Sequence, residues 1–229
     1  MWLPIFKIYL IDKQLNYQKI IPMKKYLFIM MLLVAIPYVL SAQDFKYGVK
    51  AGLNVNNLSV TPELDPPAPS ARIGIHLGGF AQYGLSDQFL IQPEVVISTQ
   101  GANDQDPEVE QNVKLTYLNL SGVAKYQIGN GISVFAGPQL GFLMDGEFEE
   151  VDKVDGSQEF FAADAVYKST DFSFSLGAGY TLESGIHIDL RYNLGLSNNN
   201  DDPLESAFYD RNQEVKSRTF QISIGYTLN

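Results

Sequence analysis

Five charged or titratable residues stand where they could form a relay or a network of ion pairs. Asp189 and Arg191 lie two residues apart, and Glu94, Lys125 and His76 lie in other segments of the 229-residue chain. Carboxylate and imidazole groups can pass protons, and buried opposite charges attract one another. The open readings are a proton or ion relay and a structural salt-bridge network. We favour the structural network.

A nucleophile and a base also lie close in sequence, at Ser184 and His187. Such a pair could serve a lipid-modifying enzyme, but no third group that would orient the histidine is evident. We therefore predict no catalytic site and no enzyme.

Acidic residues cluster in two segments, which offer oxygen ligands of the kind that divalent cations prefer. Neither segment has calcium-loop spacing, so we predict solvated acidic loops with no metal and no cofactor. The residues are Asp104, Asp106, Glu108 and Glu110 in the first segment, and Glu147, Glu149, Glu150, Asp152 and Asp155 in the second.

The elements that must position these groups show most clearly between Phe172 and Leu196. Apolar and polar residues alternate from Phe172 to Tyr180 and again from Ile186 to Leu196. A period of two indicates a β-hairpin with one apolar and one polar face. A three-residue loop at 183–185, with Gly185 last, would pair Tyr180 with Ile188 and keep apolar residues opposite each other.

The same alternation recurs along the chain and predicts eight strands, joined alternately by long loops and short turns. The expected strands are 45–60, 72–83, 89–100, 113–126, 132–144, 172–180, 186–196 and about 217–228. The expected long loops are 61–71, 102–112, 145–168 and 198–216, and the short turns include Leu85–Asp87 and a three-residue turn at Gly129–Gly131. No apolar segment of helical period follows, so the fold should be all β.

A tyrosine recurs near the end of each strand that enters a short turn, and near the end of the last strand. Four outward side chains would therefore lie at one level, as in the aromatic girdle of a membrane barrel. They are Tyr83, Tyr126, Tyr180 and Tyr226.

The amino terminus has the layout of a secretory signal peptide. Two lysines after Met23 precede an apolar run that ends near Ser41-Ala42, so we predict cleavage after Ala42, with residues 1–22 an over-long gene start and 43–229 the mature domain. Removing residues 1–42 changes the formal charge from −10 to −14, which argues against nucleic acid as a partner. The absence of cysteine fits an envelope protein without disulfides.

An eight-stranded sheet with one apolar face could be a soluble barrel with an apolar cavity or a membrane barrel with an apolar exterior. Here the polar face carries glycine, serine, amides and charges, which could fill a narrow lumen but not line an apolar cavity. The sequence therefore predicts an all-β, eight-stranded antiparallel up-and-down transmembrane barrel in the outer membrane. Its long loops should be extracellular and its short turns periplasmic.

Four segments resemble the PorT-like outer-membrane β-barrel family: FLIQPEVVISTQGA (89–102), KLTYLNLSGVAKYQIG (114–129), VFAGPQLGFLM (134–144) and LGAGYTLESGIHIDLRYNLGLSN (176–198). The resemblance covers nearly all of the mature chain. It implies a Gram-negative outer-membrane barrel that contacts lipid and the barrel insertion machinery.

The leading hypothesis is a non-enzymatic barrel that serves envelope integrity or binds envelope partners through its acidic loops. The alternatives are an accessory component of a secretion or transport complex, which the founding member of the PorT family suggests, and a lipid-modifying barrel enzyme.

Overall fold

The computed structural model describes residues 45–61, 70–105, 109–153, 157–162, 167–199 and 214–228. The predicted signal peptide, its cleavage after Ala42 and the over-long start at residues 1–22 lie outside these ranges. Within them, no helix is long and apolar enough to cross a membrane.

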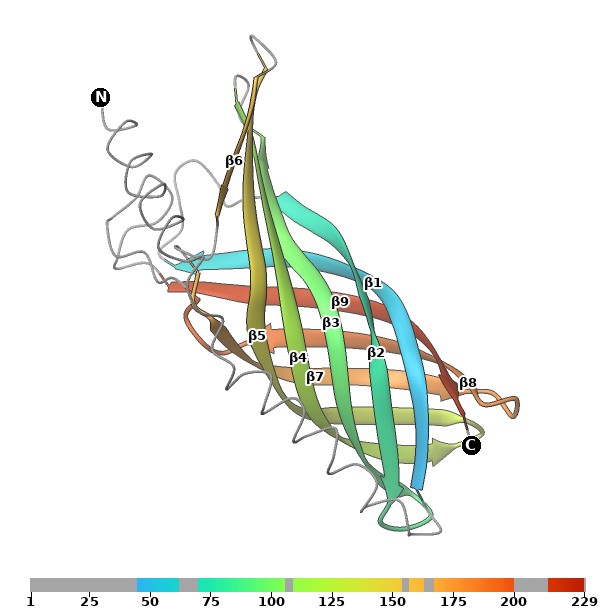
Figure 1. Ribbon diagram of the computed structural model, residues 1–229. Helices are drawn as coiled ribbons and strands as arrows, with labels where there is room; N and C mark the ends of the chain where they lie inside the picture. Colours follow the sequence, from blue (N-terminus) through green and yellow to red (C-terminus); the bar gives the residue numbers. More distant parts are fainter. Residues whose placement is uncertain are drawn as a thin grey trace, which may run out of the picture. The chain divides into compact units, whose positions relative to one another are not determined.

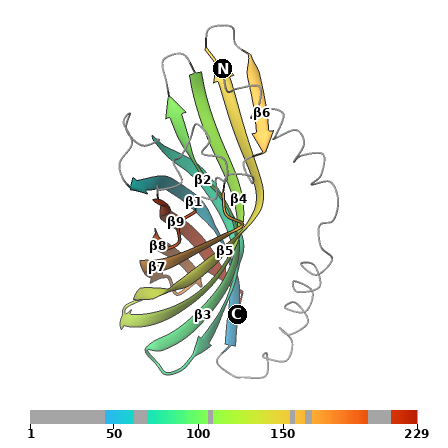
Figure 2. The same cartoon turned by 90° about the vertical axis from the view of Figure 1, so that its left-hand side faces the viewer.

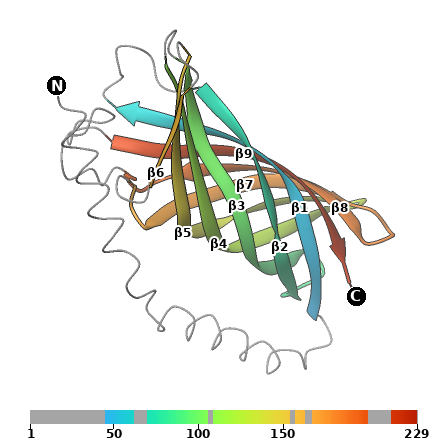
Figure 3. The ribbon, with the colours of Figure 1, turned by 45° about the horizontal axis from the view of Figure 1, so that its top comes forward.

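The described residues form one antiparallel sheet in which eight strands close into a barrel. The sheet order is β4-β3-β2-β1-β9-β8-β7-β5, and a further pairing of β4 with β5 completes the ring (Figures 1 and 3). This closed barrel confirms the predicted fold class. The barrel strands are β1 (Phe45–Thr61), β2 (Ser70–Gly84), β3 (Phe89–Gln105), β4 (Val109–Gly129), β5 (Ile132–Asp152), β7 (Thr170–Thr181), β8 (Ile186–Gly195) and β9 (Glu214–Thr227).

The alternation of side chains decides which face of the sheet is turned inward. In β8, exposed and buried residues alternate from Ile186 to Asn193. Large apolar side chains face outward, and Ile73 and Leu77 are 72% and 65% exposed. The inward side chains are mostly polar and buried. This is the reverse of a water-soluble protein and suits a barrel surrounded by lipid.

The short turns define one end of the barrel, here called the turn end. In the turn at 183–185, Leu182 N donates to Ile186 O at 2.8 Å and Gly185 has a φ of 85°. The predicted three-residue loop and the pairing of Tyr180 with Ile188 are therefore confirmed.

The turn after β4 differs from its prediction. Gly129 pairs with Ile132, which leaves a two-residue turn, Asn130-Gly131, with φ values of 51° and 80°. Positive φ at both positions is the signature of the tight turn that Asn-Gly sequences favour in hairpins. A register shift between Gln127 and Gly129 absorbs the extra residue, so Tyr126 still pairs with Val134 as predicted.

The opposite end, here called the loop end, carries a projecting sheet that the sequence did not predict. β4 and β5 pair from Val109 and Asp152 onward, and a ninth strand, β6 (Gln158–Ala162), pairs with β5 (Figure 2). Much of the two acidic segments is therefore strand, and the predicted loops at 102–112 and 145–168 are wrong in extent. The low strand propensity of the acidic residues concealed this extension, because pairing between neighbouring strands overrides propensity.

Beneath the projecting sheet, a cluster of buried apolar side chains lies at the loop end of the barrel. Val215 is fully buried and Tyr117 is 2% exposed. We refer to it as the loop-end cluster. It comprises Leu58, Ala102, Leu115, Tyr117, Phe148, Tyr167 and Val215.

Candidate functional site

The charged side chains of the lumen come from strands that lie far apart in the sequence. Glu94 of β3 accepts two hydrogen bonds from Arg191 of β8, from Nη1 to Oε2 at 2.7 Å and from Nη2 to Oε1 at 2.6 Å. Both side chains are almost fully buried. A bidentate arginine–carboxylate pair of this kind has short, directional hydrogen bonds, which are stronger than those between neutral groups.

Two further side chains complete the surroundings of Glu94. Lys50 Nζ lies 3.4 Å from each carboxylate oxygen, and Gln92 Nε2 donates to Oε1 at 2.6 Å. Gln92 in turn accepts a hydrogen bond from Gln82 at 2.7 Å. Because a buried carboxylate is costly without partners, these donors compensate for its removal from water.

A second ion pair lies beside the first. Lys125 Nζ is 3.7 Å from Asp189 Oδ1. Lys125, Phe135, Gly177 and Arg191 occupy paired positions on four adjacent strands. Lys125 Nζ lies 5.8 Å and Arg191 Cζ lies 5.1 Å from the centre of the Phe135 ring, so both cations are within range of its π face.

His76 belongs to a separate, uncharged cluster. Its Nδ1 lies 2.7 Å from Asn54 Oδ1 and its Nε2 lies 2.8 Å from Ser223 Oγ. Asn54 Nδ2 also donates to Ser98 Oγ at 2.8 Å, and Gln221 Nε2 donates to Asn54 Oδ1 at 2.9 Å. Every polar group of the imidazole is thus engaged.

Inward glycines make room for the large side chains of the lumen. A Cβ atom added at Gly177 would collide with the Phe135 ring, and one added at Gly179 would collide with the Asp189 carboxylate. A Cβ atom added at Gly225 would likewise collide with the His187 ring. We call these glycine–knob pairs. They are Gly48 with Phe80, Gly52 with His76, Gly177 with Phe135, Gly179 with Asp189, and Gly225 with His187.

The structure brings the five predicted network residues into the lumen but divides them. Glu94 lies with Arg191, Lys125 lies with Asp189, and His76 lies in the uncharged cluster. Lys50 was not among the predicted network residues, although it contacts Glu94. Its place on the polar face of β1 was the available signal, but its partner depends on how the barrel closes.

The structure does not assemble the nucleophile and base that the sequence offered. His187 is 1% exposed and packs edge-on against Phe80, with ring centres 5.0 Å apart. Its Nε2 has no hydrogen-bond partner among the described residues, whereas Ser184 is exposed in the turn. Among the described residues, no group of three or more histidine, aspartate or glutamate side chains could hold a metal ion.

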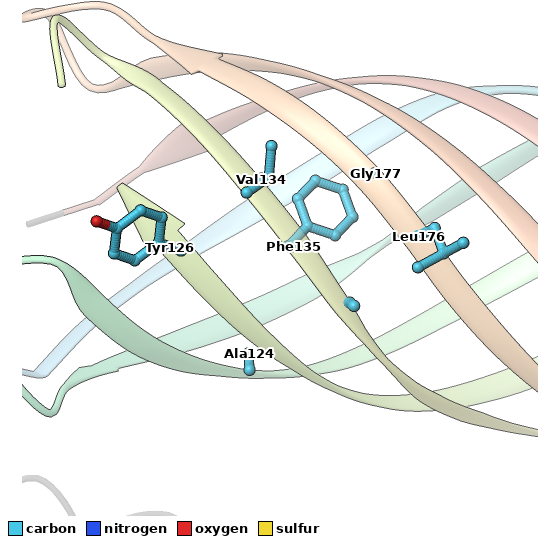
Figure 4. A pocket seen from close by; sticks show the side chains of 7 residues that line it. Ala124, Tyr126, Val134, Phe135, Leu176 and Gly177 are labelled. Carbon is cyan, nitrogen blue, oxygen red and sulfur yellow. The ribbon is translucent and has the colours of Figure 1, made fainter. Parts of the chain in front are cut away.

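A hollow on the outer wall of the barrel is lined mainly by apolar residues. It has a volume of about 410 Å³, and Ala124, Val134, Ala136 and Leu176 line it beside Tyr126 (Figure 4). Its lining offers no acid–base pair and no strong nucleophile. It can accommodate apolar groups, such as acyl chains of surrounding lipid.

The four recurring tyrosines all lie near the turn end. Tyr83, Tyr180 and Tyr226 are 42–48% exposed. Tyr126 is half-buried because its ring packs against Phe89, with centres 4.8 Å apart. Amphipathic rings gathered at one level suit the boundary between hydrocarbon and water.

Comparison with solved structures finds other small barrels at low identity. The attachment invasion locus protein Ail of Yersinia pestis is 14% identical, with 81% of this chain and 100% of that chain covered and a TM-score of 0.49. Neisserial surface protein A is 15% identical, with 79% and 95% covered and a TM-score of 0.47. OprG of Pseudomonas aeruginosa is 12% identical, with 80% and 96% covered and a TM-score of 0.42.

No curated protein sequence matches the chain. A family model, described as outer membrane protein beta-barrel domain, matches residues 41–201, which is most of the chain. The match covers every barrel strand except β9. Together with the closed barrel and its apolar exterior, it shows that the chain belongs to the outer membrane protein β-barrel domain family.

Proposed function

We propose that this outer-membrane barrel is not an enzyme and that it presents its projecting sheet to a partner in the cell envelope. The observation that carries the proposal is the length of β4 and β5, which have 21 residues each against 12 in β7 and 10 in β8. About 10 tilted residues span a bilayer, so the additional residues lie beyond the membrane. A rigid platform of this kind favours binding over catalysis.

Acidic side chains give the projecting sheet its chemical character. Glu147 is exposed and Glu149 is half-buried. Glu159 of β6 and the acidic residues of the strand ends add to them in sequence, and Lys114 of β4 stands opposite Glu147 of β5. A partner with a basic surface would be attracted over a distance of about 10 Å at moderate ionic strength.

Several features of the sequence support an orientation in the envelope. A cleaved signal peptide ending at Ala42 would send the chain to the periplasm of a Gram-negative cell, where the barrel insertion machinery would receive it. The tyrosines at the turn end would then lie at the periplasmic interface, and the projecting sheet would lie outside the cell. The similarity of four segments to PorT-like proteins agrees with this arrangement.

In this proposal the lumen network of Glu94, Lys125, Asp189, Arg191 and His76 is structural. The paired charges hold β3, β4 and β8 together across the barrel. They fill the space that a pore or a substrate would need.

The test is affinity purification of crosslinked partners from native envelopes, with wild type compared to a Glu147→Lys/Glu149→Lys variant. We expect partners enriched with wild type to fall at least fivefold with this variant. Glu183→Lys is the control, because Glu183 is an exposed acidic residue at the turn end. Equal recovery with all three proteins would contradict the proposal, as would equal loss with Glu183→Lys.

A further inference from the structure

Hydrogen bonding is unevenly distributed around the lumen wall. Among the described residues, six buried side-chain atoms have no hydrogen-bond partner. All six belong to β7 or β8, on one side of the barrel. They are Ser173 Oγ, His187 Nε2, Asp189 Oδ1, Asp189 Oδ2, Arg191 Nε and Asn193 Nδ2.

These atoms form a row along the strand. His187, Asp189, Arg191 and Asn193 are four successive inward residues of β8. Ser173 extends the row by one step, because it is paired with Gly195, two residues after Asn193. The row therefore runs from the turn end of the barrel to the last residue of β8.

The opposite wall behaves differently although it is equally polar. Asn54, Gln92 and Ser98 of β1 and β3 are buried, and each has hydrogen bonds to neighbouring side chains. His76 of β2 uses both ring nitrogens. Poor packing of the whole lumen therefore does not explain why the buried polar atoms of β7 and β8 lack hydrogen-bond partners.

A buried carboxylate with two unsatisfied oxygens is costly, and such groups in proteins are usually satisfied by internal water. Successive inward side chains of a strand lie about 6.7 Å apart, and a water hydrogen bond spans about 2.8 Å, so one or two water molecules can bridge each step. The inward positions of β7 from Ser173 to Gly179 are only serine and glycine. Because the Phe135 ring and the Asp189 carboxylate occupy the space over Gly177 and Gly179, the room for water lies beside the small side chains of Ser173 and Ser175.

Donors and acceptors follow one another along this row. Asp189 offers acceptors, whereas Arg191 Nε and Asn193 Nδ2 offer donors. Water can donate to the first and accept from the others. We propose that a file of ordered water occupies the lumen along β8, from His187 to Ser173, while the wall of β1 to β3 stays dry. The file ends beneath the loop-end cluster, which is built mainly from apolar side chains.

The chain has no cysteine, so single cysteines can probe both walls. Ser175 pairs with Asn193 beside the file, and Ser98 lies on the dry wall; both are 0% exposed. We would compare Ser175→Cys with Ser98→Cys in lipid vesicles, using silver ion, which is small enough to follow a water file. Thiols that stay unmodified would be counted by alkylation after unfolding.

We expect Ser175→Cys to react at least tenfold faster than Ser98→Cys. Similar rates for the two thiols, whether fast or slow, would overturn the proposal, because burial alone would then explain them. Ser173→Cys gives a second measurement against the same reference if Ser175→Cys does not fold, since the Ser173 hydroxyl has no hydrogen bond to a described protein group that the substitution would break. Heat-dependent migration in gels would verify folding of each variant.

Discussion

Arg191 is the residue on which the charge balance of the lumen depends most. Its Nη1 and Nη2 atoms both donate to Glu94, and the other cation that contacts Glu94 among the described residues is Lys50, at 3.4 Å. We expect Arg191→Met to lower the free energy of unfolding by about 3–5 kcal/mol, because it leaves a buried carboxylate poorly compensated. Urea unfolding in lipid vesicles, followed by tyrosine fluorescence, would measure the loss.

The double variant Glu94→Gln/Arg191→Met provides the matched comparison. Removing both charges leaves buried Lys50 without its carboxylate partner, so the double variant should restore only part of the lost stability. Disruption of the exposed pair Glu214–Lys216 by Glu214→Gln should leave the unfolding midpoint unchanged. Equal effects of Arg191→Met and Glu214→Gln would argue against a structural role for the lumen pair.

Gly177 offers a second prediction about single residues. Its Cβ would meet the Phe135 ring, whereas a Cβ at the outward Gly122 would meet nothing within 4 Å. We expect Gly177→Ala to destabilise the barrel by about 1–3 kcal/mol through overpacking. Gly122→Ala should be nearly neutral in the same unfolding measurement, and Phe135→Leu should partly rescue Gly177→Ala.

For single residues, the sequence predicted which face of the sheet a side chain lies on better than it predicted which other side chains it contacts. Alternation placed Glu94, Asp189 and Arg191 on the inner face, and all three are buried there. It could not show that Lys50 meets Glu94, nor that Phe135 fills the space over Gly177. Those contacts depend on strand order, register and closure, which no single strand encodes.

Among the elements, the hairpin turn at Asn130-Gly131 is the most demanding in backbone conformation. Gly131 has a φ of 80°, and a Cβ there would also approach Thr181 O. We expect Gly131→Ala to lower stability by about 1–2 kcal/mol, which is the usual cost of a left-handed non-glycine residue. Asn130→Gly, which keeps the permitted φ, should leave the unfolding midpoint nearly unchanged; equal losses would mean that the backbone conformation is not responsible.

The strands were predicted well in the wall of the barrel and poorly in the projecting sheet. From Ile186 to Asn193 the alternation follows the burial pattern residue by residue. Between Asp145 and Asp152 the sequence is acidic, yet β5 continues there because β4 pairs with it on one side and β6 on the other. Pairing partners stabilise these residues, and alternation alone does not reveal partners.

At the scale of the whole molecule, the orientation of the barrel wall makes a direct prediction about lipid. Leu77 and Leu85 are 65% and 61% exposed, but Leu77 lies in the strand wall and Leu85 lies at the turn end. In lipid vesicles, we expect Leu77→Arg to cost about 2–4 kcal/mol and Leu85→Arg at most about 1 kcal/mol. Reversible unfolding of both variants in the same vesicles would measure the difference.

If Leu77→Arg and Leu85→Arg cost similar amounts of stability, the wall around Leu77 would not face hydrocarbon.

The closed barrel itself followed from the sequence, because an apolar outer face and a polar inner face leave few alternatives for eight strands. The projecting sheet did not follow, since no feature of its sequence distinguishes paired acidic strands from solvated loops.

The glycine–knob pairs also bear on how the barrel assembles. A hairpin that slips by two residues keeps its inward and outward faces and most of its backbone hydrogen bonds, so alternation cannot reject it. Such a slip would press the Phe135 ring against Ser175 or Gly179 of β7 and leave the space over Gly177 unfilled. Because the five pairs fit only in the native register, we expect them to disfavour slipped pairings when the strands meet during folding.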